Sequence, residues 1–254
     1  MVSAEEDLDV FESGLSTLFN EPEVNYGDVG QTVTVELPNE PKISLMLPDV
    51  DPTNVKLFAH HVWKGSILLS KILQSKQIQG KVLELGAGCG LPSIVLARKG
   101  IQVVSSDYPD PDIIAKLKQN VKNNNVNVEV IGHIWGVRND ELQGKFDHII
   151  MSDTLWMAHQ HDNLLQDLDE YLTPNGSVIG VAGFHSGIYA VEKFFKLAEE
   201  KFDRIHYQTY IIPIGHGLCE HMEWERAPKG IVISNDIKER ARYIFHYEFK
   251  RKAQ

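Results

Sequence analysis

Three glycines with the spacing G-x-G-x-G offer the clearest chemistry in this sequence. Gly86, Gly88 and Gly90 follow a short apolar run with the pattern of a strand, and a helical pattern comes after them. Glycines at such a strand-to-helix turn let a ligand approach the backbone and the helix N-terminus closely. Asp107 ends the next apolar run, where its carboxylate can accept hydrogen bonds from ribose hydroxyls. Together these residues predict a site for an adenosyl nucleoside.

Two neighbours of the glycines refine this prediction. Glu84 lies inside the apolar run, and a buried carboxylate needs a partner, for which the amino group of a methionine moiety would serve. Leu91 stands where a dinucleotide fingerprint has its third glycine. That difference, with the lack of a recognisable Ser/Tyr/Lys catalytic set, argues against the alternative of an NAD-dependent oxidoreductase.

The elements that must position these residues alternate along the chain from Lys81. Strands are expected at 82–85, 101–106, 126–131, 146–151 and 177–182, the last after a turn at 174–176. Helices are expected at 91–99, 112–123, 163–171 and 188–201. Two more strands, 205–214 and 243–249, flank a short helix at 236–242. We therefore expect an α/β fold with a Rossmann-like, doubly wound, seven-stranded sheet, mostly parallel, with an antiparallel C-terminal strand.

The first part of the chain has a different pattern. An acidic arm precedes two alternating runs, 32–37 and 43–47, and the separating Pro38-Asn-Glu-Pro41 is typical of a β-hairpin. Residues 54–77 have helical spacing that Gly65 interrupts, so we expect either one helix or two there. We therefore expect a boundary between residues 1–53, an N-terminal arm and hairpin extension, and residues 54–254, the main domain.

The net charge of −10 is concentrated near the N-terminus. Residues 1–60 contain 12 acidic residues and only two basic ones, whereas residues 61–254 contain 23 of each. The acidic segment is either a solvated tail or a surface that attracts a basic protein segment. No basic face is expected, so direct binding of nucleic acid is disfavoured.

Composition also excludes several classes of protein. No stretch approaches 18 consecutive apolar residues, so we expect no membrane span. The acidic N-terminus does not resemble a secretory signal. Two cysteines, Cys89 and Cys219, make no disulfide framework, which favours a reducing compartment and a cytoplasmic location. We expect a monomer.

Further motifs extend the pattern around the glycine turn. They are Val62-Trp-Lys-Gly65, Leu83-Glu-Leu-Gly-Ala-Gly-Cys-Gly-Leu-Pro92, Ile134-Trp-Gly136 and Ser152-Asp-Thr-Leu-Trp156. Together they resemble the class I, seven-strand S-adenosylmethionine-dependent methyltransferases, and in particular the family-16 lysine methyltransferases. Within that family the acidic arm and hairpin resemble the fungal enzymes that methylate the N-terminal α-amine and adjacent lysine of translation elongation factor 1-alpha.

The resemblance implies a role for each matching residue, with S-adenosylmethionine as cofactor and S-adenosylhomocysteine as product. The cofactor-binding residues would be Trp63 and Trp135 at the adenosine, Gly86, Ala87 and Gly88 along the methionine and ribose, Asp107 at the ribose hydroxyls, Tyr108 beside the adenine and Ser152 near the reacting centre, together with Glu84. Asp153 would be catalytic and would grip the target ammonium group. Trp156 would also be catalytic, at a position where the family usually has Tyr or Phe.

Several alternatives stay open. Six residues have proton-relay or zinc-ligating chemistry, namely His159, His161, His185, His216, Cys219 and His221. Methyl transfer needs no metal, and none is expected. The substrate could be a small molecule such as nicotinamide in place of elongation factor 1-alpha. A non-catalytic module that retains the cofactor fold is a further alternative.

Overall fold

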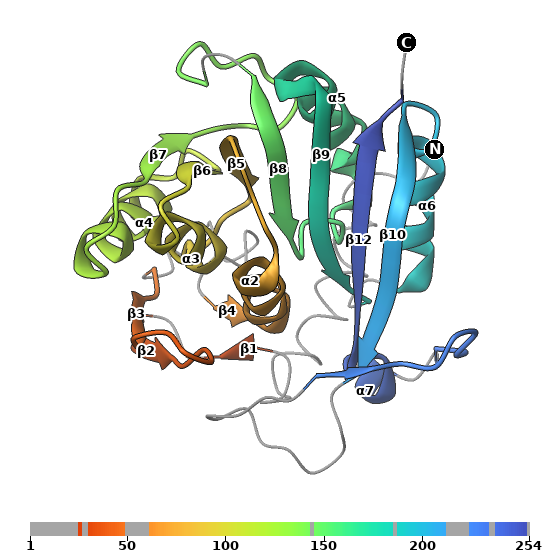
Figure 1. The fold of residues 1–254 in the computed structure, drawn as a ribbon, viewed down its shortest axis with the longest axis horizontal. Helices are drawn as coiled ribbons and strands as arrows, with labels where there is room; N and C mark the ends of the chain where they lie inside the picture. Colours follow the sequence, from red (N-terminus) through yellow and green to blue (C-terminus); the bar gives the residue numbers. More distant parts are fainter. Residues whose placement is uncertain are drawn as a thin grey trace.

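A central sheet carries the glycine turn and its acidic neighbours (Figure 1). The computed structural model describes residues 25–26, 30–48, 61–142, 145–184, 187–211, 224–233 and 237–252. Across these residues the sheet has eight strands in the order β11-β10-β12-β9-β8-β5-β6-β7. Their bounds are β5 (Lys81–Leu85), β6 (Gln102–Asp107), β7 (Glu129–Gly132), β8 (Phe146–Ser152), β9 (Leu172–Gly183), β10 (Phe202–Ile211), β11 (Glu225–Arg226) and β12 (Tyr243–Arg251).

The strand directions confirm the expected fold class. β5 to β9 are parallel to one another, and β12 runs antiparallel between β9 and β10. These seven strands are the expected sheet. The two-residue β11, which was not expected, adds an edge strand beside the end of β10. Parallel strands with both faces covered are apolar throughout, and Val82, Leu83 and Leu85 of β5 are accordingly fully buried.

Helices cover both faces of the sheet (Figure 1). On one face lie α2 (Lys64–Ser75), α3 (Leu91–Arg98) and α4 (Pro111–Asn123), and on the other lie α5 (His161–Tyr171) and α6 (Ile188–Ala198). Leu69 of α2 packs in one apolar cluster with Val82, whereas Phe194 of α6 packs in another with Leu83. Successive residues of β5 thus point to opposite faces, as a strand requires. In the described ranges, no helix is long and apolar enough to cross a membrane.

The expected N-terminal hairpin is confirmed. β2 (Thr32–Val35) and β3 (Ile43–Met46) pair antiparallel, and Ile43 and Leu45 belong to one apolar cluster with Ile94 of α3. A second short pair joins β1 (Asn25–Tyr26) to β4 (Val62–Trp63). This pair leads directly into α2 and so fixes where Trp63 stands.

Several element boundaries were wrong. Of the region with helical spacing over 54–77, residues 54–60 lie outside the described residues; within the described part, α2 begins at Lys64 directly after β4, with Gly65 in its first turn. The turn expected at 174–176 lies inside β9, because a register irregularity in its pairing with β8 absorbs those residues. The helix expected to reach 201 ends at Ala198. The short helix expected over 236–242 is α7 (Ile237–Arg240). The acidic arm and residues 49–60 lie outside the described residues.

Candidate active site

A pocket opens at the carboxyl ends of the parallel strands, where the strand order reverses between β5 and β8. Ligands of open α/β sheets bind at such a reversal. The pocket and the open space at its mouth together amount to about 850 Å³. Its walls are lined by Trp63, Gly86, Gly88, Asp107, Tyr108, His133, Ile134, Trp135, Ser152, Asp153, Thr154, Trp156, Met157 and Gln160.

The glycine turn forms part of this wall. Gly86 and Gly88 have φ values of 68° and 52°, in the left-handed region that favours glycine. A Cβ at position 86 would lie 2.8 Å from Thr154 Cγ2 and 3.1 Å from Trp135 Cζ2. A Cβ at position 88 would meet no described atom within 4 Å. The backbone at Gly88 therefore borders open space that a ligand can occupy, just before the N-terminus of α3.

Asp107 connects the end of β6 to the glycine turn. Its Oδ2 accepts a hydrogen bond from Gly88 N at 2.6 Å, and its Oδ1 accepts one from Tyr108 N at 2.7 Å. Burial raises the pKa of this carboxyl above its ordinary value, against the opposing effect of the two hydrogen bonds. Each carboxylate oxygen can accept a further hydrogen bond. The group can therefore still accept from two hydroxyls of a ligand lying on Gly88.

Asp153 is fixed at the end of β8 in an unusual backbone conformation. Its φ is 51°, which costs about 1–3 kcal/mol for a residue other than glycine and is a feature that clusters at functional sites. Its Oδ1 accepts a hydrogen bond from Gly183 N at 2.6 Å, and its Oδ2 accepts one from Gly65 N at 3.1 Å. A carboxylate held in this way at a pocket wall can attract and orient a cation such as an ammonium group.

The predicted aromatic residues and Ser152 also line this pocket. They are Trp63, Tyr108, Trp135 and Trp156. Tyr108 is 45% exposed, so its ring has room to stack on a base. The Ser152 hydroxyl is buried without a hydrogen-bond partner among the described residues. With Gly86, Gly88, Asp107 and Asp153, nine of the eleven predicted site residues share one pocket.

The other two predicted residues, Glu84 and Ala87, lie behind the pocket wall. Ala87 is 8% exposed, and its N donates to Ser106 O at 3.0 Å. Glu84 Oε2 accepts hydrogen bonds from the Ser93 backbone N–H at 3.2 Å, from the Ser93 hydroxyl, and from the Ser105 hydroxyl at 3.4 Å. Burial raises the pKa of Glu84 to about 8. Its contact with the cofactor's amino group stays a prediction.

Five lining residues had no predicted role, namely His133, Ile134, Thr154, Met157 and Gln160. All of them follow the ends of β7 and β8 and flank Trp135 or Asp153 in the chain. Because the carboxyl ends of parallel strands meet at one edge of a sheet, their positions alone could have drawn attention to them.

The histidines considered for proton relay do not line this pocket where the structure describes them. His161 donates through Nε2 to Leu155 O at 2.9 Å, its ring packs on Phe194, and burial lowers its pKa. His159 is exposed. His185 and the three possible zinc ligands in 216–221 lie outside the described residues. Within the described ranges, no group of three His, Cys, Asp or Glu side chains could hold a metal.

The fold and the pocket together define the class of protein. It is a Rossmann-like, nucleoside-binding class, and in this chain the antiparallel strand β12 lies beside β9. A TehB-like SAM-dependent methyltransferase from Corynebacterium glutamicum has this fold, with a TM-score of 0.51 and 18% identity over 74% of this chain and 88% of that one. The sequence model of the lysine methyltransferase family matches residues 49–201. The chain belongs to that family.

The curated relatives of this chain include fungal proteins. The chain is 34% identical over 200 residues to a protein N-terminal and lysine N-methyltransferase EFM7 of Cryptococcus neoformans, covering 69% of this chain. It is 32% identical over 164 residues to the efm7 protein of Schizosaccharomyces pombe with the same description, covering 57% of this chain. In both cases the match spans 64% of the relative's length.

Proposed function

We propose that this chain is an S-adenosylmethionine-dependent protein N-methyltransferase whose target is the N-terminal α-amine, the adjacent lysine, or both, of translation elongation factor 1-alpha. The observation that carries the proposal is that one pocket is lined both by the glycine turn with Asp107 and by Asp153 with Trp156. The first set suits a nucleoside and the second suits an amine. Family membership and the descriptions of the fungal relatives support the same activity.

The residues around the glycine turn fit S-adenosylmethionine. When bound, this cofactor supplies an electrophilic methyl group on a sulfonium. Asp107 would accept hydrogen bonds from the ribose hydroxyls, and the open backbone at Gly88 would lie along the ribose and methionine. Tyr108, Trp135 and Trp63 would pack against the adenosine, as their places on the wall allow.

Three residues, at the end of β8 and in the loop after it, would receive the target amine. Asp153 would bind the ammonium form and orient it, since its carboxylate is fixed by two backbone N–H groups. A carboxylate stabilises the ammonium form, so Asp153 acts by positioning rather than as a strong base. Trp156 would close the target side of the pocket against water, and Ser152 would lie near the reacting centre. The nitrogen must come in line with the methyl group at about 3–3.5 Å.

The proton of the amine must leave before transfer. With a pKa of about 7.7–8.0, roughly 10–15% of an α-amine is neutral at pH 7, against about 0.04% of a lysine. The α-amine is therefore the easier target. A lysine in the same place depends more on desolvation by the aromatic wall, which lowers its pKa.

The proposal extends to the whole chain. The acidic segment 1–60 would attract a basic segment of the target. Residues 1–53 would serve as an extension of a methyltransferase domain at 54–254. We propose that the chain acts as a monomer in the cytoplasm and without direct contact to nucleic acid or membrane.

A side-by-side assay with labelled S-adenosylmethionine tests the proposal. The chain is incubated with unmethylated elongation factor 1-alpha in one reaction and with nicotinamide in another, and an Asp153→Ala variant is the control. We expect label in the protein only, and at least tenfold less label with the variant. Label only in nicotinamide would contradict the proposal. Binding of S-adenosylhomocysteine without any label would favour a non-catalytic module instead.

A further inference from the structure

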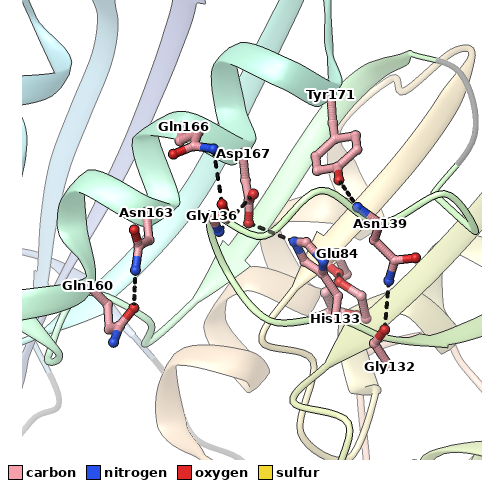
Figure 2. Close-up of polar contacts among 11 residues, drawn as sticks. Glu84, Gly132, His133, Gly136, Asn139, Gln160, Asn163, Gln166, Asp167 and Tyr171 are labelled. Atoms are coloured by element: carbon pink, nitrogen blue, oxygen red, sulfur yellow. Dashed lines mark hydrogen bonds and ion pairs between the residues drawn. The ribbon is translucent and has the colours of Figure 1, made fainter.

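One face of helix α5 holds the loop that carries Trp135 and Ile134 (Figure 2). The side chain of Gln166 donates to Gly136 O at 3.0 Å, and the hydroxyl of Tyr171 accepts from Asn139 N at 3.1 Å. The loop adds a bond of its own, from the Asn139 side chain to Gly132 O at 2.8 Å. The loop is therefore bonded to α5 at several points, in addition to the backbone bond from His133 N to Asp107 O at 2.7 Å that continues the pairing of β6 with β7.

Asp167 is the centre of this arrangement. Its Oδ2 lies 2.7 Å from His133 Nε2, and its Oδ1 accepts a hydrogen bond from Gly136 N at 3.0 Å. The two bonds join one carboxylate to both ends of the segment 133–136, so Ile134 and Trp135 lie between two anchored residues. His133 and Asp167 are each 2% exposed, so water does not compete for these bonds.

The hydrogen-bonding capacities of Asp167 and His133 determine which ring nitrogen of His133 carries a hydrogen. A carboxylate can only accept, so His133 Nε2 carries the hydrogen. His133 Nδ1 is buried without a hydrogen-bond partner among the described residues. Asp167 thus fixes both the orientation and the tautomer of His133.

The loop has little other support on its pocket side. Ile134 is 44% exposed. Trp135 contacts the glycine turn, since a Cβ on Gly86 would lie 3.1 Å from its ring. Gly136 has φ 75°, and a Cβ there would lie 2.6 Å from Asn163 Oδ1 of the same helix. A small shift of this loop against α5 would therefore move Trp135 against the glycine turn.

We propose that Asp167 is a positioning residue for the nucleoside: through His133 and Gly136 it sets the place of Trp135 on the pocket wall. The proposal rests on the proposed function, because it takes S-adenosylmethionine or S-adenosylhomocysteine as the ligand of that wall. Asp167 itself does not line the pocket, so its effect on binding passes through the loop.

The test is calorimetric titration of S-adenosylhomocysteine into Asp167→Asn. An amide cannot accept from both His133 and Gly136: its NH2 either faces the Gly136 N–H, or faces His133 Nε2, which can accept only if the ring hydrogen moves to the buried and unpartnered Nδ1. One buried hydrogen bond is lost in either case. We expect the dissociation constant to rise about tenfold, as for loss of one buried hydrogen bond. Asp169→Asn is the matched control on the same helix, since Asp169 pairs with Lys201 and Arg251. It should leave the dissociation constant unchanged.

A double-mutant cycle separates positioning from general destabilisation. In a Trp135→Leu background, Asp167→Asn should change the dissociation constant by less than about twofold. A full tenfold change in that background, or an unchanged constant in Asp167→Asn alone, would overturn the proposal. If Asp167→Asn does not fold, His133→Leu serves instead and should weaken binding in the same way. If the wild-type chain itself binds no S-adenosylhomocysteine, the proposed function fails. If the wild-type chain binds it and Asp167→Asn binds it equally well, only the positioning role of Asp167 fails.

Discussion

Asp107 is the residue on which the proposed nucleoside site depends most. Its carboxylate organises the glycine turn through Gly88 N and would also accept from the ribose. In Asp107→Ala both interactions are lost, and hydrogen bonds to a charged group contribute about 1.5–3 kcal/mol each. We predict that the dissociation constant for S-adenosylhomocysteine rises at least 30-fold in calorimetry. An unchanged constant with normal thermal unfolding would remove Asp107 from the ribose role.

The burial of Glu84 leads to a prediction about the stability of the folded chain rather than about ligand binding. Its pKa in the folded chain is about 8, against an ordinary value of 4.5. Between these values the folded state holds a proton that the unfolded state has released. The free energy of unfolding therefore falls as pH rises from about 5 to 8, by up to about 1.4 kcal/mol per pH unit.

Glu84→Gln removes this titration and keeps an acceptor oxygen for Ser93. Urea unfolding at several pH values should show the variant gaining stability relative to the parent chain as pH rises. Parallel stability curves for the two proteins would show that Glu84 does not titrate in this range.

At the scale of residues, sequence patterns predicted the groups with an obvious chemical signature. Asp107 could be predicted because it ends an apolar run, and Asp153 because the motif Ser152–Trp156 resembles that of the family. The side chains of Thr154 and Met157 have no such signature, and only their positions after β8 could have drawn attention to them. One oxygen of the Glu84 carboxylate is bonded by Ser93, in the first turn of the next helix, and the other has no hydrogen-bond partner among the described residues, so its expected contact with a ligand stays a prediction.

At the scale of elements, Asn120 of α4 and Asn124, which directly follows this helix, attach the N-terminal hairpin. Asn120 is fully buried, and its side chain accepts from Met46 N at 2.7 Å and donates to Met46 O and Cys89 O. Asn124 bonds the backbone of Ser44 in the same way. The hairpin is thereby joined to the helix that follows β6, and its apolar face completes the core over α3.

We predict that Asn120→Ala lowers the free energy of unfolding by about 3 kcal/mol, because three bonds are lost and buried backbone groups of β3 lose their partner. Urea denaturation measures this change. Asn123→Ala is the control: this residue is exposed and reaches only the Met46 sulfur, at 3.5 Å. Equal stability of the two variants would contradict the role of Asn120.

Elements of the parallel sheet could be predicted well because buried strands and amphipathic helices differ in period. The first and last residues of these elements were harder to predict. Asn175 and Gly176 have the composition of a turn, yet they lie within β9 because the neighbouring strand tolerates an irregular register. β11 is two residues long and has no periodicity to detect.

At the scale of the whole molecule, charge is the main feature that the pocket does not explain. Residues 2–20 hold five acidic residues and no basic ones. Deleting them should leave S-adenosylhomocysteine binding unchanged. It should slow methylation of a basic protein target several-fold at low salt, because electrostatic steering raises the rate at which enzyme and target meet and is screened by salt. Rates are measured at low and physiological ionic strength. Equal rates for both proteins at low salt would contradict steering by the arm.

The central claim is that one pocket brings a nucleoside at Asp107 to an amine at Asp153. Mass spectrometry of elongation factor 1-alpha peptides after incubation with the chain and S-adenosylmethionine tests it most directly. The comparison uses a target with a free N-terminus and one with an acetylated N-terminus. We predict methyl groups on the N-terminal peptide of the free target, and on the acetylated target at most on the adjacent lysine. No methyl group on that peptide, from a chain that binds S-adenosylhomocysteine, would contradict the account.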